Sequence, residues 1–419
     1  MSSRKQLKTT SCIDSVKGAI AKSLLSIPVA LSLVACATGP TQYAEFSLND
    51  EQHQAVLSQP VQLQPAFEQL YKEGRRNEVL NYMEIGSQAF KHGYYGQASS
   101  AFDAAINNIN SVYADNAEAQ KARSLWHEEG RKDFKGEPYE RAMVFFYRGL
   151  IYLRDGDYEN ARASFINGIM QDAFAEEEQN RSDFALFLYL AGWSAQKMGA
   201  YELAKSHFEE LKIYRPDIEI PKTSDDVLVV AATGLSPRKL ADGVGHYQLV
   251  YRRGKGFAEN RVDLNYADLQ VSAYPVEDLY FQASTRGGRA VDKIIEGKVA
   301  FKKTTAEIGT TLTNVTNNSW MAGYAATQGS SGTNTFAALT AVSVTAMALS
   351  AKTKPRADTR YWKGLPDTVH VKTIRSRAGL DTVTASFKTL DGRTLNELQT
   401  KSEIHFDGND NGLVYLSSR

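Results

Sequence analysis

The chain has 419 residues, of which 42% are hydrophobic and 23% are charged, so it can bury two or more ordinary cores and is not disordered as a whole. Cationic and acidic side chains both number 48, and without the first 35 residues 43 and 47 remain, a net charge of about −4. This balance gives no reason to expect nucleic-acid binding, which needs a concentrated cationic field.

The N-terminus has the layout of a bacterial export signal, with five cationic residues, an apolar run over 24–34 and a small-residue cleavage site. The run is too short to span a bilayer, which takes about 20 residues. It ends in Leu33, Val34 and Ala35 before Cys36, and this sequence resembles a bacterial lipobox. The resemblance implies removal of residues 1–35 and lipid on the cysteine. The alternative is an uncleaved hydrophobic segment that contains a cysteine by coincidence.

The residues after Cys36 indicate the destination of the chain. Ala37 stands where an aspartate is associated with retention in the inner membrane, so the resemblance to sorted lipoproteins implies an outer-membrane anchor that faces the periplasm. Residues 36–50 are polar and turn-rich, which is typical of a tether. The second cysteine, Cys12, lies in the segment expected to be removed, so no internal disulfide is expected.

Residues 51–217 contain one pattern three times: Gly, six residues, then Gly-x-Tyr-x-x-Ala-x-x-x-Phe. The Ala and the Phe share one helix face, and the small Ala lets a partner helix approach closely. The second Gly follows an apolar-periodic run, where a helix ends in a left-handed turn. The pattern therefore predicts a helix, a tight turn and a second helix. The copies are Gly86, Gly93, Tyr95, Ala98, Phe102; Gly149, Gly156, Tyr158, Ala161, Phe165; and Gly192, Gly199, Tyr201, Ala204, Phe208.

This layout resembles the tetratricopeptide repeat (TPR). The copies lie 63 and 43 residues apart, where tandem repeats of that family have about 34, and polar insertions at 110–138 and 171–182 explain the excess. The resemblance implies a surface that binds peptides or protein segments. The alternative is that the helices only space and support the rest of the chain.

Beyond three prolines between residues 216 and 237, the periodicity shifts from 3.6 toward 2, which predicts a second domain over 218–419. A helix at about 288–308 and a small-residue region up to 352 form a helical insertion in it. The predicted fold class is α+β, with an N-terminal all-α TPR-like domain followed by a mixed α+β domain. The predicted strands are 227–230, 247–251, 269–274, 368–372, 382–387 and 412–416.

Three phrases carry a wider resemblance: Tyr139-Glu140-Arg141, Gly234 to Lys239, and Ala357 to Trp362 with Leu365-Pro366. Through them the chain resembles an uncharacterised family of Gram-negative TPR-containing lipoproteins. Members look associated with lipoproteins similar to the curli-secretion pore or to activators of penicillin-binding proteins. The resemblance implies envelope assembly, with other envelope proteins as partners, and assigns no catalytic residue.

The segment 335–351 is rich in Ala, Ser and Thr and has two interpretations. Small residues let helices pack closely inside a membrane. The segment is only about 17 residues long, however, and its small polar residues gain little from hydrocarbon, so a buried or interfacial helix is favoured.

Known catalytic and metal-binding patterns are missing from the sequence. The seven histidines form no close pair at metal spacing, no Gly-x-Ser-x-Gly elbow occurs, and Gly254-Lys255-Gly256 is not a complete phosphate loop. Asp407 to Gly412 copies the first half of a calcium loop, but its twelfth position would be Ser418, so a hairpin turn is favoured. We therefore expect no metal, no cofactor and no small-molecule substrate.

The cations Arg252, Arg253 and Lys255 stand close together in the sequence, and a solvated face is the favoured interpretation. The first functional hypothesis is a protein-binding scaffold or assembly factor of the envelope, held to the membrane by its lipid. The second is a structural subunit of a ring or pore-associated complex. A cell-wall enzyme is the third, and clustered Asp, Glu or His in a deep cleft would favour it.

Overall fold

A computed structural model of the chain describes residues 44–114, 133–173, 184–242, 248–284, 358–398 and 400–419. The chain divides into two units between Glu45 and Phe46, and all the helices and strands below belong to the second unit. The export signal, Cys36 and the insertion expected at about 288–352, with its segment 335–351, lie outside the described residues.

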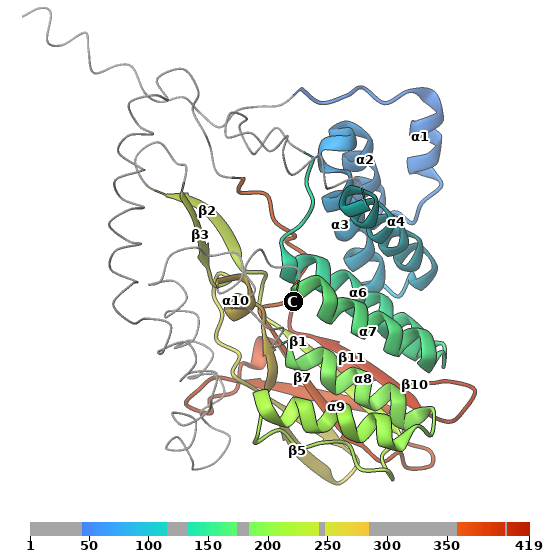
Figure 1. Cartoon of the computed structure of the whole chain (residues 1–419), viewed down its shortest axis with the longest axis vertical. Coiled ribbons are helices and arrows are strands. Elements are labelled where there is room, and N and C mark those ends of the chain that lie inside the picture. Colours follow the sequence, from blue (N-terminus) through green and yellow to red (C-terminus); the bar gives the residue numbers. More distant parts are fainter. Residues whose placement is uncertain (1–43, 115–132, 174–183, 243–247, 285–357, 399) are drawn as a thin grey trace, which may run out of the picture. The chain divides into compact units, whose positions relative to one another are not determined.

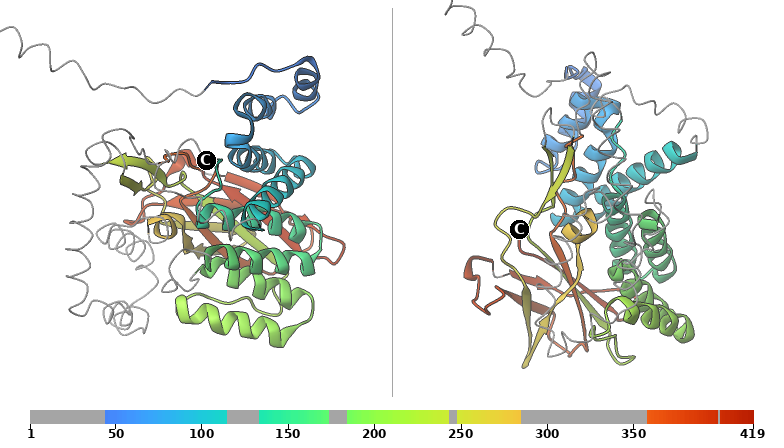
Figure 2. Two further views of the ribbon diagram at one scale, coloured as in Figure 1. Left: turned by 45° about the horizontal axis from the view of Figure 1, so that its top comes forward. Right: turned by 60° about the vertical axis from the view of Figure 1, so that its left-hand side comes forward.

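The described residues between 50 and 214 form helices, which include three hairpins with connecting turns of three residues. The hairpins follow one another in chain order, and the strands lie along one side of them (Figures 1 and 2). The helices are α1 (Asp50–Leu57), α2 (Gln64–Glu73), α3 (Glu78–Lys91), α4 (Tyr95–Ala114), α6 (Pro138–Arg154), α7 (Tyr158–Ala173), α8 (Ala185–Lys197) and α9 (Tyr201–Tyr214), with a 3-10 turn η1 (Gly74–Asn77) before α3. The hairpins are α3–α4, α6–α7 and α8–α9.

Each hairpin is closed by one contact between the first Gly and the Phe of the repeated pattern. The Phe ring from the second helix lies against the glycine of the first helix, where a Cβ atom would overlap it. Ordinary carbon–carbon contacts are about 3.5–4 Å long, so only glycine permits this approach. The pairs are Gly86–Phe102, Gly149–Phe165 and Gly192–Phe208, with distances from an ideal Cβ to the ring of 2.4, 2.3 and 2.4 Å.

The other positions of the pattern set the turn and the second helix. The second Gly has positive φ in each copy, as expected for a left-handed turn at a helix C-terminus. The Ala is buried in each copy. The predicted helix–turn–helix geometry is therefore present three times. The glycines are Gly93 (φ 77°), Gly156 (φ 74°) and Gly199 (φ 75°), and the alanines are Ala98, Ala161 and Ala204.

The strands form a central five-stranded sheet, a four-stranded sheet and a separate two-stranded ribbon. In the central sheet β11 is parallel to β1, and the other pairs are antiparallel. The central sheet has the order β10 (His405–Phe406), β11 (Gly412–Ser417), β1 (Val227–Thr233), β7 (Thr368–Ile374), β6 (Pro275–Asp278). The four-stranded sheet has the order β5 (Leu269–Ala273), β4 (Arg261–Tyr266), β8 (Thr382–Lys388), β9 (Thr400–Glu403). The ribbon pairs β2 (Arg238–Asp242) with β3 (Gln248–Arg252).

The central sheet is covered on both faces, which produces three layers. Leu228 and Val230 of β1 belong to the same core as the helices, whereas Val227, Val229 and Ala231 pack with the four-stranded sheet. This explains why β1 is a continuous apolar run and not an alternating one, because a strand buried on both faces has no solvated side.

The first helices of the second and third hairpins, α6 and α8, are almost completely buried, whereas few residues of α9, the last helix, are buried. Thirteen of the 17 residues of α6 and 12 of the 13 residues of α8 are buried, against three of the 14 residues of α9. Phe90 of α3 packs edge-on against Tyr415 of β11 at 4.9 Å between ring centroids. The sheet therefore covers the inner side of the hairpins, and one core runs from helices to strands.

The α+β class and all six predicted strands are confirmed, and the strand ends differ from the predicted ones by at most three residues. The strands β2, β4, β6, β9 and β10 are additions to that prediction. The division into domains at residue 217 stays a prediction, while the described helices and strands share a core.

Candidate functional site: a buried strap beside a basic pocket

Residues 358–367, here called the strap, run between the helices and the central sheet. Trp362 is fully buried, and its backbone N–H donates to Glu140 of α6 (2.7 Å). Its carbonyl accepts from Ser236 Oγ (2.7 Å), and its indole N–H donates to Ser87 of α3 (3.2 Å). One strap residue therefore connects two helices with the segment between β1 and β2, and it brings together the three phrases that were singled out in the sequence.

The strap is also fixed on either side of that tryptophan. Arg360 pairs with Asp358 (2.6 Å) and donates to Asn77 Oδ1 of η1 (2.7 Å). The backbone N–H of Lys363 donates to Glu84 of α3 (2.7 Å). These contacts attach the strap to the helical layer at successive points, so it has little freedom to move relative to α3.

Glu140 is the acid of α6 that accepts the backbone N–H of Trp362 at this junction. Its second carboxylate oxygen accepts the backbone N–H of Glu137 at the start of α6 (2.7 Å), and the side chain has no exposure. Burial raises the pKa of Glu140 to about 7, with the charge of Lys239 acting in the opposite direction. Lys239 forms an ion pair with Glu137 (2.7 Å). Burial lowers the pKa of Lys239, but attraction to the two glutamates outweighs this and raises it.

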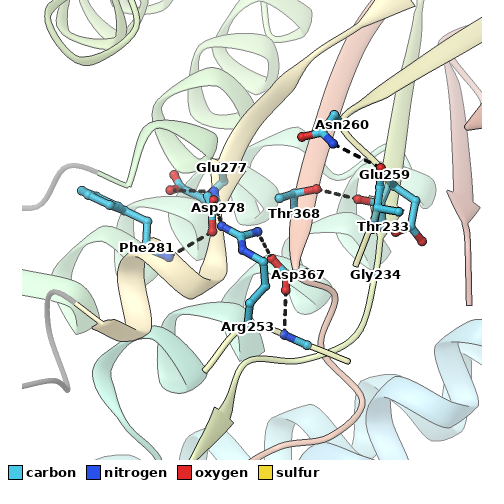
Figure 3. A network of polar contacts seen from close by, with 12 residues as sticks. Thr233, Gly234, Arg253, Glu259, Asn260, Glu277, Asp278, Phe281, Asp367 and Thr368 are labelled. Atoms are coloured by element: carbon cyan, nitrogen blue, oxygen red, sulfur yellow. Dashed lines mark hydrogen bonds and ion pairs between the residues drawn. The ribbon is translucent and has the colours of Figure 1, made fainter. Parts of the chain in front are cut away.

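A second buried network lies at the other end of the strap (Figure 3). The guanidinium group of Arg253 pairs with both Asp278 and Asp367, two carboxylates without exposure. Asp367 also accepts the backbone N–H of Gly254 (3.0 Å), and Asp278 accepts the N–H of Phe281 (3.0 Å) at the start of the short helix α10 (Leu279–Gln282). Arg253 is therefore the counter-charge that both buried carboxylates share.

The shifted pKa of Asp367 and a helix-capping contact next to this network indicate that it stabilises the fold. Burial, with the negative charge of Asp278 added, raises the pKa of Asp367 well above its usual range, and Arg253 opposes the shift. The neighbouring Glu277 is equally buried, and its carboxylate accepts the N–H of Leu186 in the first turn of α8 (3.3 Å). A strand carboxylate thereby caps a helix N-terminus, where negative charge is stabilising.

A pocket of about 580 Å³ opens beside Arg253. The ribbon β2–β3 and the turn that follows it supply most of its lining, and Tyr280 of α10 supplies one wall. The Arg253 guanidinium lies over the rings of Phe257 (4.6 Å) and Tyr280 (4.9 Å). Of the three cations predicted to form a solvated face, Lys255 is exposed and Arg252 is partly buried, whereas Arg253 is only 18% exposed and belongs to the ion-pair network. The lining residues are Arg238, Arg252, Arg253, Gly254, Lys255, Gly256, Phe257 and Tyr280.

The three tyrosines of the repeated pattern have different environments. Tyr95 packs edge-on against Phe90 at 5.5 Å between centroids. Tyr158 donates to Asp407 and accepts from Asn411 (2.9 Å), so the β10–β11 hairpin is attached to the turn of the second helical hairpin. Tyr201 is 59% exposed. The three tyrosines of the pattern therefore do not form a single binding surface.

The expected hairpin turn over Asp407 to Asn411 is present between the antiparallel strands β10 and β11. The Asp407 carboxylate accepts the backbone N–H groups of Asn409 (2.7 Å) and Asn411 (3.1 Å). The alternating oxygen-bearing residues of this segment are therefore explained by the hydrogen bonds of the turn.

Within the described residues, no group of three or more His, Cys, Asp or Glu side chains has a geometry that could hold a metal ion. His370 is fully buried, its Nδ1–H donates to the carbonyl of Ala273 (3.0 Å), and its Nε2 lies 3.2 Å from Thr368 Oγ1. Burial lowers the pKa of His370 to about 4. In the same part of the chain, no helix combines the length and the apolar character needed to cross a bilayer.

The sequence indicates part of this site. It singles out Glu140, Trp362 and the phrase around Ser236, but it does not show that they touch, since they lie about 100 or more residues apart. The acidic partners of Arg253 were not identified from the sequence at all. Arg253 and its two aspartates lie far apart in the sequence and form no local pattern, whereas the cluster of cations that includes Arg253 could be identified from the sequence.

Comparisons with known proteins do not place the chain in a family. No family model matches it, and neither a curated protein nor a solved structure is significantly similar to it.

Proposed function

We propose that the chain is an outer-membrane-anchored periplasmic lipoprotein that acts as a protein-binding scaffold or assembly factor in the cell envelope. The lipobox-like sequence ending at Cys36 supports the anchor. We also infer that the three hairpins are TPR-like repeats, because they share one glycine–aromatic contact and one left-handed turn. This proposal assigns no catalytic role to any residue.

The observation that carries the binding role is the contrast between the two sides of the hairpins. The enclosed helices α6 and α8 contact the sheet, so the partner surface is assigned to the second helices α7 and α9. Exposed apolar side chains on these helices include Met170 (48%) and Ile213 (62%). Apolar side chains on a rigid repeat surface are suited to a protein partner.

The anchor is tested by mass spectrometry of the N-terminus and by fractionation of cells. We expect a triacylated Cys36 in the outer membrane, and a Cys36→Ser chain that is neither processed nor sorted there. An intact, unmodified N-terminus in the cytosol would refute the location.

The binding surface is tested by photocrosslinking in cells. A crosslinker at Ile213 or Met170 should capture the same envelope proteins, and one at Leu390, which is 43% exposed on a strand connection, should not. Ile213→Glu combined with Met170→Glu should abolish the capture. If all three positions capture the same set, or none captures any, the scaffold role fails.

The ring alternative makes a different prediction about mass. A strictly monomeric particle in solution excludes a ring subunit, while a defined oligomer favours it over the scaffold.

A further inference from the structure

The pocket beside Arg253 concentrates positive charge in a chain whose expected mature form is negative overall. Arg238, Arg252 and Lys255 line it together with Arg253, and none of its described lining residues is acidic. A net charge of about −4 for residues 36–419 does not by itself produce such a cluster.

The fold holds two of these cations against each other. Arg238 and Arg252 are direct partners in the β2–β3 ribbon, and like charges in directly opposite positions destabilise a strand pair. A bound anion would remove that repulsion. Arg238 Nε donates to the carbonyl of Arg253 (3.1 Å), so its guanidinium is positioned by the backbone.

The floor of the pocket is held in place by buried ion pairs. The two buried aspartates more than offset the charge of Arg253, and its guanidinium lies over the rings of Phe257 and Tyr280. The charge available to a ligand therefore comes from Arg238 and Lys255, and the aromatic rings offer a surface for an organic group.

We propose that this pocket binds the phosphate group of a phosphate ester, with Arg238 and Lys255 contacting its oxygens and the aromatic walls contacting its organic part. Arginine forks match phosphate oxygens in pairs, and lysine adds a point charge. A doubly charged phosphate matches the two unit charges of Arg238 and Lys255 better than a singly charged carboxylate does. This inference goes beyond the scaffold role and does not depend on it.

The phosphate can belong to a soluble ester or to a lipid headgroup, and two probes separate these sources. The full chain with Cys36→Ser, which carries no acyl anchor, is titrated with glycerol 3-phosphate in a calorimeter. The same protein is sedimented with vesicles that contain phosphatidic acid, and with phosphatidylcholine vesicles as a reference. Saturable binding to either phosphomonoester, weakened by added salt, is expected.

Variants decide whether the pocket is responsible. Arg238→Gln and Lys255→Gln should each weaken binding about tenfold or more, because each removes a charge-assisted hydrogen bond. Lys401→Gln removes the same charge from an exposed position of β9 and should change binding less than twofold. Lys255 is exposed, so its variant should fold even if the Arg238 variant does not.

The proposal is overturned if neither probe binds, if the pocket variants bind like the parent chain, or if Lys401→Gln weakens binding as much as they do. Binding of glycerol 3-phosphate supports a soluble ester, and binding of phosphatidic acid vesicles alone supports a lipid headgroup.

Discussion

The glycine–aromatic contact of the helical hairpins makes a prediction that runs against helix propensity. Alanine normally stabilises a helix relative to glycine by about 1 kcal/mol. At Gly149, however, an ideal Cβ would lie 2.3 Å from Cε1 of Phe165 and 2.7 Å from Cζ. Because Phe165 has no exposure, its ring has no free space to enter, and the overlap must be relieved by moving the helices apart.

The size of the effect follows from these two opposing contributions. Overpacking a filled core costs about 1–3 kcal/mol, which equals or exceeds the propensity gain. Gly149→Ala should therefore leave the free energy of unfolding unchanged at best and lower it by up to about 2 kcal/mol. Gly96→Ala is the matched control, since Gly96 lies in the first turn of α4 and a Cβ there would meet nothing within 4 Å. Subtracting the control isolates the steric cost of about 1–3 kcal/mol.

Urea unfolding of the purified chain, followed by tryptophan fluorescence and circular dichroism, measures the difference between the two variants. Phe165→Leu in the Gly149→Ala background should recover part of the loss and give a coupling free energy above about 0.5 kcal/mol. If Gly149→Ala is as stable as Gly96→Ala, the repeated glycine does not serve this contact, and the account of the pattern is wrong.

Three further predictions concern the polar contacts. Arg253→Met should lower the free energy of unfolding by about 3–5 kcal/mol, because it leaves two buried carboxylates without a counter-charge, and a loss below about 1 kcal/mol in thermal unfolding would contradict the network. Tyr158→Phe should cost about 1.5–3 kcal/mol through its lost bond to a carboxylate, while Tyr201→Phe at the exposed equivalent position should be neutral in the same assay. Since burial raises the pKa of Glu140 from 4.5 to about 7, the folded chain binds a proton that the unfolded chain has released between these values. The stability due to this residue should therefore fall as pH rises from about 4.5 to 7, by up to about 3 kcal/mol, and a Glu140→Gln chain with an unchanged pH profile would refute this.

The features that could be predicted from the sequence are those with a local cause. The hairpins were predictable because the glycine, the turn and the aromatic stand within 16 residues of each other. The strand β4 also carries a local pattern, with Val262, Leu264 and Tyr266 buried at alternate positions. This period of two would have identified it.

The site could not be predicted in the same way, because its contacts join distant segments. Trp362 meets Glu140 across 222 residues of chain, and Arg253 meets Asp367 across 114. The sequence pattern identified both residues of the first contact and only Arg253 of the second, and only the fold shows why a buried acid occurs in α6. It accepts a backbone N–H from the strap that would otherwise be buried without a partner.

The covering of the inner helices changes what the repeated pattern implies about binding. A row of such hairpins offers an inner surface to a peptide only where no other part of the chain occupies it. Here α6 and α8 are enclosed, and a peptide that entered would have to displace the sheet and expose the core around Leu228, Val230 and Tyr415. Exposing three such side chains alone costs several kcal/mol, at about 1.5–3 kcal/mol each. A partner that binds without this cost must use the second helices of the hairpins, the edges of the sheets or the basic pocket. The crosslinking contrast between Ile213 and Leu390 and the effect of Lys255→Gln on phosphate binding distinguish these surfaces.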